Sequence, residues 1–584
     1  MDFCRSMADV HMVLWIVPLV SALALAGLGA RLSGRALAVL SLGSLGWVLA
    51  QVSVASIFLL WGAPGGYSNL VVLDWMTWPG MELAFSLDRM GAWALLVSVG
   101  VALAAQIHAL ASVSRFAGRH RFFALIQVVV ASAAFLYTAG SRPVLLIGWE
   151  GLALGIAFMA GFWEAEQSGG RVGMRWLLSQ RLSGMLLLLG LLLMESRPEL
   201  GLVLMVAAAL VRAGLMPFHG WLLDTGGAPA SAKALVFGVG STLASVHLLM
   251  RLAPQIIHSP HVMQILGVVG VASVALGLLA GLQQHNPDKR LGWLFVVQGG
   301  LVMLGFALGD PVAATLLVTA QCLLMGGLTL ATGSLVSTGE GTTTIWRSKR
   351  AYWALGATWA LPASVGFVGL GRLFGSVGHG GMDRFVLVAA IAGPVISGWI
   401  MQRIYRDLRR HPMELSGPMR LSDSLGMVVA PAMLAAAMLV LGVLTLSLHG
   451  LIAAGGWRGV SWAGAATAGA ILASVLAWLL GRREIKLRFG RLTRAQRVME
   501  WIADSGLGIG ELVVQLPLHL GRMLGVILWR VVSVGIIDTL ILGTVVRTIE
   551  GVGTAIRFLN NGRIQRSILW TVLTLLLVLG LMVR

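Results

Sequence analysis

Glu150 and Arg212 are the residues of this chain best suited to chemistry, because each lies inside a long apolar segment. Glu150 interrupts residues 145–155, and Arg212 interrupts residues 206–215. A charge at such depth in a membrane is costly, and it is usually paired with an opposite charge and tied to transport. We therefore predict that Glu150 and Arg212 form a buried ion pair in the interior of a membrane protein.

The composition supports a membrane protein and argues against a soluble one. Hydrophobic residues make up 57% of the 584-residue chain, charged residues only 11%, and 75 residues are glycine. Soluble domains carry roughly 25% charged residues. The net charge of +18 does not predict nucleic-acid binding. The basic residues occur in short clusters between apolar runs, which is typical of topology signals and contacts with anionic lipids.

The apolar runs predict an all-α polytopic fold. We count about sixteen runs long enough to cross a bilayer core of roughly 30 Å, whereas barrel strands would be shorter and alternating. Basic clusters follow the odd-numbered spans, for example at residues 115–121, 347–350 and 403–410. By the positive-inside rule these connections are cytoplasmic, so the N-terminus is expected on the non-cytoplasmic side of the cytoplasmic (inner) membrane. The first apolar stretch is interpreted as a span and not as a cleaved signal.

The last hundred residues follow a different pattern. Between residues 482 and 566 charges recur every few positions among apolar residues. This spacing predicts a long amphipathic helix that lies along the membrane or along neighbouring subunits. An ordinary surface-bound amphipathic helix is the alternative. A final apolar run within residues 567–584 predicts one more span.

Two spans are predicted to be interrupted. The seventh carries Gly214 and Pro217 just after Arg212, and the twelfth carries Pro362 and several glycines before Arg372. Proline removes a backbone donor and glycine loosens a helix. Interrupted helices at corresponding places of two repeats indicate an ion-translocation site in transporters. The alternative is that proline and glycine are simply frequent in membrane helices.

No pattern for a cofactor, a metal or a soluble-type active site is found. Cys4 and Cys322 are too few and too far apart for a metal site or a disulfide framework. The chain has no glycine-rich phosphate loop after a strand and no HExxH pair. We assign no catalytic, cofactor-binding or metal-binding residue.

Several segments resemble a known family. Residues 146–154, residues 216–224 with Ala228-Pro229-Ala230, and residues 287–291 resemble signature stretches of the antiporter-like membrane subunits of respiratory complex I and of Mrp-type sodium/proton antiporters. Residues 529–538 and 561–566 resemble the end of the largest, distal (L or chain 5 type) complex I subunit. That subunit carries a lateral helix and a sixteenth span.

The resemblance implies a domain organisation built on two inverted five-helix repeats. The first repeat would hold helices 4–8 and the second helices 9–13, each with one broken helix. The implied regions are residues 1–120 (helices 1–3), 121–250 (first repeat), 262–404 (second repeat), 424–481 (helices 14 and 15), 482–566 (lateral helix) and 567–584 (terminal span).

The resemblance also implies a proton relay, which this chain matches only in part. Glu150 matches the family's glutamate, but Arg212 stands where a lysine is expected. Arginine stays protonated, so Arg212 can hold Glu150 ionised but cannot pass on a proton. Three further relay positions depart from the family: Gly238 and Gln321 replace histidines, and Met325 replaces a lysine. The twelfth-span lysine falls near Leu370, with Arg372 two residues on.

Other polar residues could compensate. Lys233, His219, His247 and Arg372 are candidate relay groups, while Arg181, Gln298 and Gln321 are candidate structural polar residues. We expect Arg181 to contact a nearby carboxylate or carbonyl groups, and the two glutamines to hydrogen-bond between helices or support a water chain. Lysines at span ends commonly snorkel to the interface, and a single buried histidine is more often hydrogen-bonded than a relay.

The leading hypothesis is an antiporter-like proton-translocation subunit of a complex I-type (NADH:quinone oxidoreductase-like) assembly. Its relay would be partly degenerate, and its lateral helix would bind other membrane subunits. The chain alone is not expected to be an enzyme, because the NADH and quinone sites of complex I belong to other subunits. The alternatives are the membrane subunit of a two-component inorganic-carbon (bicarbonate) uptake system and a cation/proton antiporter subunit.

Overall fold

The protein is described from a computed structural model. It covers residues 2–452 except 62–70, 74–82, 114, 115, 117, 163–168, 224–227, 285, 338–342, 361–363, 378–382 and 411–420. It also covers residues 543–559 and 564–582, and isolated residues between 469 and 530.

The described residues are almost entirely helical, as the apolar runs predict. The elements in chain order are α1 (Asp2–Leu28), η1 (Gly29–Arg31), α2 (Gly34–Trp61), β1 (Val71–Leu73), β2 (Leu83–Phe85), α3 (Arg89–Ser112), α4 (Arg119–Tyr137), α5 (Arg142–Ala160), α6 (Gly169–Leu193), α7 (Pro198–Ala213), α8 (Gly220–Leu223), α9 (Ala230–Leu235), η2 (Val236–Gly240), α10 (Thr242–Arg251), α11 (Ala253–Ile257), α12 (Pro260–Gln283), α13 (Pro287–Ala307), α14 (Pro311–Ser337), α15 (Thr343–Ala360), α16 (Val365–Gly375), α17 (Asp383–Arg410), α18 (Leu421–Ile452), α22 (Gly543–Leu559) and α23 (Ile564–Met582).

Twelve helices in the described part of the chain are long and apolar enough to cross a membrane. The prediction of a polytopic helical membrane protein is confirmed at this level, whereas the count of sixteen stays a prediction. Two of the expected spans fall short because they are interrupted: α7 ends at Ala213, and α16 has only eleven residues. The expected fifteenth span lies outside the described residues.

The purely helical prediction is wrong at one place. Strands β1 and β2 form a small antiparallel sheet in the long connection between α2 and α3, with Val72 opposite Ala84. Phe85 makes a further bridge to Ala139, so this hairpin is fastened to the end of α4. Two three-residue strands leave almost no periodic signal in the sequence.

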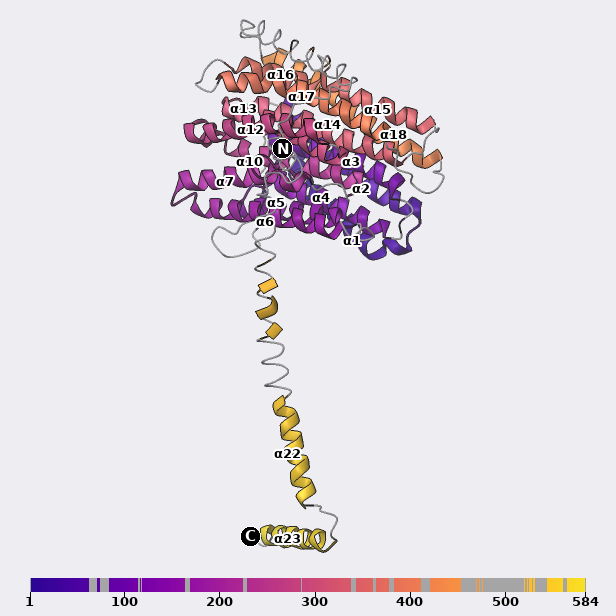
Figure 1. Ribbon diagram of the computed structural model, residues 1–584, viewed down its shortest axis with the longest axis vertical. Helices are drawn as coiled ribbons and strands as arrows, with labels where there is room; N and C mark the ends of the chain where they lie inside the picture. The colour runs from indigo at the N-terminus through magenta and orange to yellow at the C-terminus, as the bar shows by residue number, and fades with distance from the viewer. Residues whose placement is uncertain are drawn as a thin grey trace, which may run out of the picture. The chain divides into compact units, whose positions relative to one another are not determined.

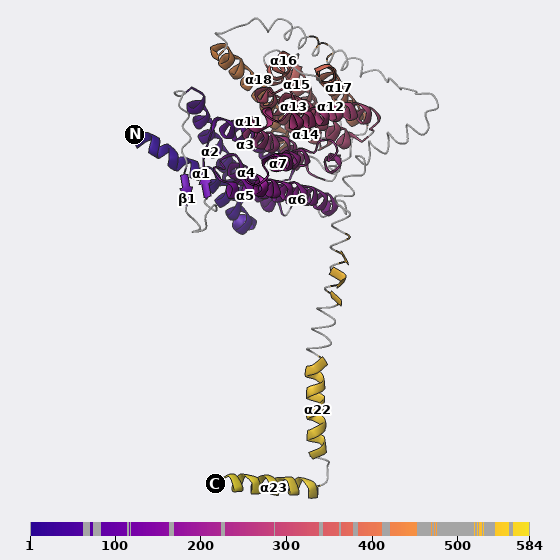
Figure 2. The same cartoon turned by 90° about the vertical axis from the view of Figure 1, so that its left-hand side faces the viewer.

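The helical bundle is built around α3 and α14 (Figure 1). Helix α14 packs against α13, α15, α16 and α18, and α3 packs against α2, α4, α14 and α18. Nearly all of the α14 side chains and most of the α3 side chains are buried. On one side of this centre, α4, α5, α6 and α7 pack in sequence order, each against the next (Figure 2). That row positions the candidate site.

Close packing between α4 and α5 depends on Gly148. A Cβ at this position would overlap the backbone of Leu136 on α4. We expect Gly148→Ala to lower the free energy of unfolding by about 1–3 kcal/mol, because backbone atoms cannot move aside as side-chain ends do. Denaturation of the detergent-solubilised protein measures this. Gly100→Ala is the control, since nothing lies within 4 Å of a Cβ there. Equal losses in both variants would contradict the prediction.

The chain divides into two compact units, residues 1–513 and 514–584. The second contains α22 and α23. Helix α23 includes the terminal apolar segment Ile568–Val578, in the region predicted to be the last span. Most of the predicted lateral helix, residues 482–566, lies outside the described residues, so that prediction stays open. The predicted inverted repeats and their boundaries also stay predictions.

Candidate functional site

The predicted interruption of the seventh span is confirmed. Helix α7 ends at Ala213, and Gly214 adopts a left-handed conformation with φ 64° and ψ 42°. The helical path resumes only at α8. A left-handed residue just past a helix end is the usual way to stop a helix, and glycine adopts it without steric cost. Arg212 therefore lies in the last turn of a helix that ends inside the bundle.

The eighth span is also irregular, which the sequence analysis missed. Between α9 and α10 the chain makes a π-helical turn, η2, followed by Ser241 at φ −108° and ψ −96°. Such turns leave carbonyl groups free of the regular helical pattern and often occur at functional sites. Here the Gly240 carbonyl accepts a hydrogen bond from Arg212 Nε at 3.0 Å. Two glycines separated by one residue, Gly238 and Gly240, were the available sequence signal.

Glu150 has a different partner from the one predicted. Its carboxylate forms an ion pair with Arg181 on α6, whereas the prediction paired it with Arg212. Gly184, one turn further along α6, makes room for this pair, because a Cβ there would overlap Glu150 Oε1. The side chains of Arg181 and Glu150 remain 35% and 29% exposed. The pair thus lies at the outer side of the contact between α5 and α6.

Arg212 lies deeper, and it is held by an aromatic ring. Its side chain is fully buried, and its guanidinium carbon lies 4.2 Å from the centre of the Trp149 ring. Such a cation–π contact contributes about 2 kcal/mol when it is desolvated. Glu150 attracts the Arg212 charge and Arg181 repels it, but the two terminal nitrogens of Arg212 have no hydrogen-bond acceptor. Sequence reasoning did not single out Trp149, although it directly precedes Glu150.

Two predicted histidines are buried and packed against aromatic rings. His219 lies in the interruption between α7 and α8 and packs on Trp293, with the ring centres 4.8 Å apart. His247 on α10 packs edge-on against Tyr137 at 5.0 Å. No ring nitrogen of either histidine has a hydrogen-bond partner. The structure therefore does not connect these histidines to Glu150 by direct hydrogen bonds.

The two predicted glutamines are buried in different settings. Gln321 on α14 donates to the Phe295 carbonyl at 3.1 Å and to Thr242 at 3.4 Å, so it joins α13 and α10 as expected. Gln298 on α13 is 1% exposed, and neither polar atom of its side chain has a partner. Only Gln321 therefore makes the predicted bonds between helices.

Lys233 and Arg372 are paired with carboxylates away from Glu150. Lys233 Nζ lies 2.5 Å from Asp288 in the first turn of α13. Arg372 Nε lies 2.8 Å from Asp310, which also accepts from the backbone N–H groups at the start of α14. Each cation is thus tied to the beginning of a neighbouring helix. The structure does not bring Lys233, Arg372 and Glu150 together.

Among the described residues no group of three or more histidine, cysteine or acidic side chains could hold a metal ion. Charged groups lie on three consecutive helices: the partly exposed pair of Glu150 on α5 and Arg181 on α6, and the fully buried Arg212 on α7. This arrangement can fix or transfer charge within the bundle.

Comparison with known proteins agrees with this architecture. Residues 195–371, which include the broken seventh span and most of the region up to α16, match the family model described as NADH:quinone oxidoreductase/Mrp antiporter, TM. This part of the chain is therefore similar to the antiporter-like membrane subunits. The predicted resemblance is therefore confirmed.

The chain is similar to proteins that carry different names. NADH-quinone oxidoreductase subunit L of Pseudomonas aeruginosa is 25% identical over 350 residues, which cover 55% of this chain and 57% of the relative. The probable inorganic carbon transporter subunit DabB1 of Halothiobacillus neapolitanus is 24% identical over 358 residues, covering 56% and 62%. The matched region thus spans little more than half of each relative.

A solved structure shows the same fold. In the Mrp complex from a Dietzia species, one chain aligns with 98% of this chain at 20% identity, with a TM-score of 0.61. The alignment covers 62% of that chain. At this identity the likeness establishes the fold alone.

Proposed function

We propose that this chain is an antiporter-like subunit of a complex I-type membrane assembly whose proton relay is partly degenerate. The observation that carries the proposal is the position of Arg212. Arg212 is the cation of the broken seventh span, and its fully buried side chain packs against the Trp149 ring. Glu150 forms its ion pair with Arg181 instead. A guanidinium keeps its proton at any accessible pH, so this cation anchors charge and does not relay it.

The surroundings of Arg212 support the same proposal. Lys233, a possible replacement for the missing relay lysine, is held by Asp288. His219 and His247 have no hydrogen bonds that would link them into a chain. Proton transfer between such separated groups would require water molecules to bridge them. The chain therefore keeps the glutamate that the resemblance implies, but its described residues do not form a continuous set of proton carriers.

The role in an assembly rests on the relatives. The Pseudomonas aeruginosa relative is named as a subunit of NADH-quinone oxidoreductase. We infer that this chain also has neighbouring membrane subunits in the cytoplasmic membrane, contacted through residues 482–566, and that its basic connections bind anionic lipids. We further propose that its N-terminus faces away from the cytoplasm and that residues 121–250 and 262–404 are inverted repeats.

Passive proton flux into liposomes tests the proposal. We expect the native chain to show no flux above empty liposomes. Arg212→Lys is expected to conduct about tenfold or more above the native chain, because a positioned acid–base group that can lose its proton speeds transfer by about 10²-fold or more. Adding Glu150→Gln to Arg212→Lys should abolish that flux. A pH-sensitive dye inside the liposomes reports each rate.

The matched control is Arg142→Lys, which makes the same exchange in an exposed ion pair with Glu195. It should behave like the native chain. Native flux that is lost in Glu150→Gln would show that the relay works despite Arg212 and would refute the degenerate relay. No proton flux in Arg212→Lys would show that the lysine alone does not restore a proton path.

A second candidate is the membrane subunit of an inorganic-carbon uptake system. It is favoured by the match to DabB1, which is as extensive as the match to subunit L. Accumulation of labelled bicarbonate by cells that express the chain with its genomic neighbours distinguishes the two candidates. Accumulation above cells without the chain would favour this second function.

A further inference from the structure

Among the described residues, Arg212 and the neighbouring ion pair together carry one positive charge more than they neutralise. Glu150 carries one negative charge, and Arg181 and Arg212 each carry a positive one. Because Glu150 is engaged by Arg181, Arg212 has no carboxylate of its own within the part of the chain that the structure describes. An uncompensated charge in the interior of a membrane protein is strongly unfavourable. The Trp149 ring offsets only part of this cost.

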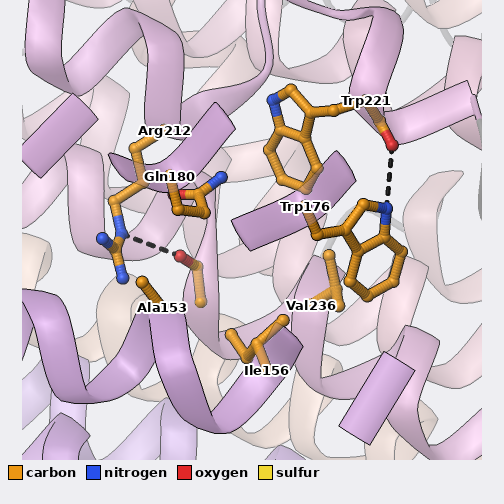
Figure 3. Close-up of a pocket in the computed structure, with 8 residues that line it drawn as sticks. Ala153, Ile156, Trp176, Gln180, Arg212, Trp221 and Val236 are labelled. Carbon is orange, nitrogen blue, oxygen red and sulfur yellow. Dashed lines mark hydrogen bonds between the residues drawn. The ribbon is translucent and has the colours of Figure 1, made fainter. Parts of the chain in front are cut away.

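Arg212 also lines a small cavity. The other lining residues include Gln180 on α6, the two tryptophans Trp176 and Trp221, and Gly240 of the π-helical turn. Figure 3 draws Arg212 and Gln180 at this pocket together with the tryptophans. Both terminal nitrogens of Arg212 and the side-chain oxygen of Gln180 are buried without a hydrogen-bond partner among the described residues. Arg212 is 0% and Gln180 only 4% exposed, so both belong to a built interior site.

The donor set suits an anion. A guanidinium offers five N–H donors, of which Arg212 uses one on Gly240. The amide of Gln180 can present its NH₂ group to the same cavity, because the two ends of a glutamine amide are nearly isosteric. Both tryptophan N–H groups are already used: Trp176 donates to the Trp221 carbonyl and Trp221 to the Val211 carbonyl. Recognition would therefore come from Arg212 and Gln180.

We propose that this cavity binds one small monatomic anion of the halide type, held by Arg212 and Gln180. The cavity volume is about 10 Å³, close to the minimum of roughly 10–15 Å³ that holds one water molecule. Chloride is somewhat larger than a water molecule, so the lining side chains must move slightly to admit it, whereas a polyatomic oxyanion would need far more space. The anion supplies the missing negative charge, so that Glu150 can stay with Arg181. This inference rests on the surroundings of Arg212 and not on the proposed subunit function.

Equilibrium binding of ³⁶Cl⁻ to the purified full-length chain in nanodiscs tests the proposal. Ionic strength is held constant with gluconate, so that non-specific attraction of anions to the positively charged protein is the same at every chloride concentration. We expect saturable binding of one chloride per chain, with bromide as a competitor. Arg212→Gln should weaken binding by at least about tenfold, the effect expected when a charged hydrogen-bond partner is lost. Arg142→Gln, the same exchange in an exposed ion pair, should leave it unchanged.

Two results would overturn the proposal. The first is native protein with no saturable chloride binding, which would leave water as the occupant of the cavity. The second is saturable binding that Arg212→Gln does not alter, which would place the ion elsewhere. If Arg212→Gln does not fold, anomalous diffraction from bromide-soaked native crystals decides the question. A bromide peak between Arg212 and Gln180 is expected, and bromide only at the protein surface would refute the site.

Discussion

Replacing Asp407 by asparagine is expected to destabilise the protein by about 3 kcal/mol or more, because it removes the carboxylate that pairs with the buried Arg290 side chain. Asp407 on α17 forms an ion pair with Arg290 on α13, and the Arg290 side chain is only 3% exposed. Arg403 and Arg406 lie close enough to repel the Arg290 charge. Without the Asp407 carboxylate, this repulsion between arginines would push α13 and α17 apart.

Chemical denaturation in detergent measures this loss, with Glu195→Gln as the control. Glu195 also pairs with an arginine, but its side chain is 77% exposed, and such surface pairs contribute no more than about 1 kcal/mol. Asp407→Glu keeps the charge and should recover most of the stability. If Asp407→Asn and Glu195→Gln lower the free energy of unfolding by the same amount, the Asp407–Arg290 pair contributes no more to stability than an ordinary surface pair.

The features that the sequence predicted correctly are local ones. The interruption of the seventh span depends on Gly214 and Pro217, which act on the backbone wherever the helix lies. The membrane location depends on hydropathy summed over each span. Neither property requires knowledge of which helix faces which. The family resemblance likewise rests on short segments that are read directly from the chain.

The partner of Glu150 could not be predicted in the same way. Arg181 and Arg212 give the same sequence signal, an arginine inside an apolar run. The choice between them depends on how α5 and α6 rotate about their axes, and Gly184 allows the carboxylate to approach α6. The Trp149 ring then contacts the guanidinium of Arg212 on α7. Contacts between helices of this kind leave no periodic trace in a single sequence.

Arg372 illustrates a related difficulty. Its place next to the interruption before α16 suggested a role in the interior. The structure pairs it with Asp310, which directly precedes the first residue of α14, and Ser376 donates to that carboxylate as well. A helix of eleven residues is too short to show from sequence which of its ends lies near the surface. The sequence shows the charge of Arg372 but not how deeply its side chain lies in the protein.

The largest effect within the candidate site is expected from Gly214→Ala, at about 3 kcal/mol of lost stability. A left-handed backbone costs a residue with a Cβ about 1–2 kcal/mol, and overpacking of a buried contact adds about 1–3 kcal/mol. Both terms apply here, because φ is 64° and the new Cβ would overlap the buried Leu222 side chain. Gly309→Ala is the matched control: its φ is 72°, but the nearest atom, Met263 Cε, is 3.6 Å away.

The comparison between these two glycines separates backbone strain from packing. Gly309→Ala should lose only the backbone contribution, and Leu222→Ala combined with Gly214→Ala should cost less than the sum of the two single variants. Additive losses would show that the overlap with Leu222 does not matter. Because Arg212 lies two residues before Gly214, the strained variant should also disturb the Arg212 contact with Trp149, which tryptophan fluorescence reports. The end of α7 would then be shown to fix the position of the buried cation.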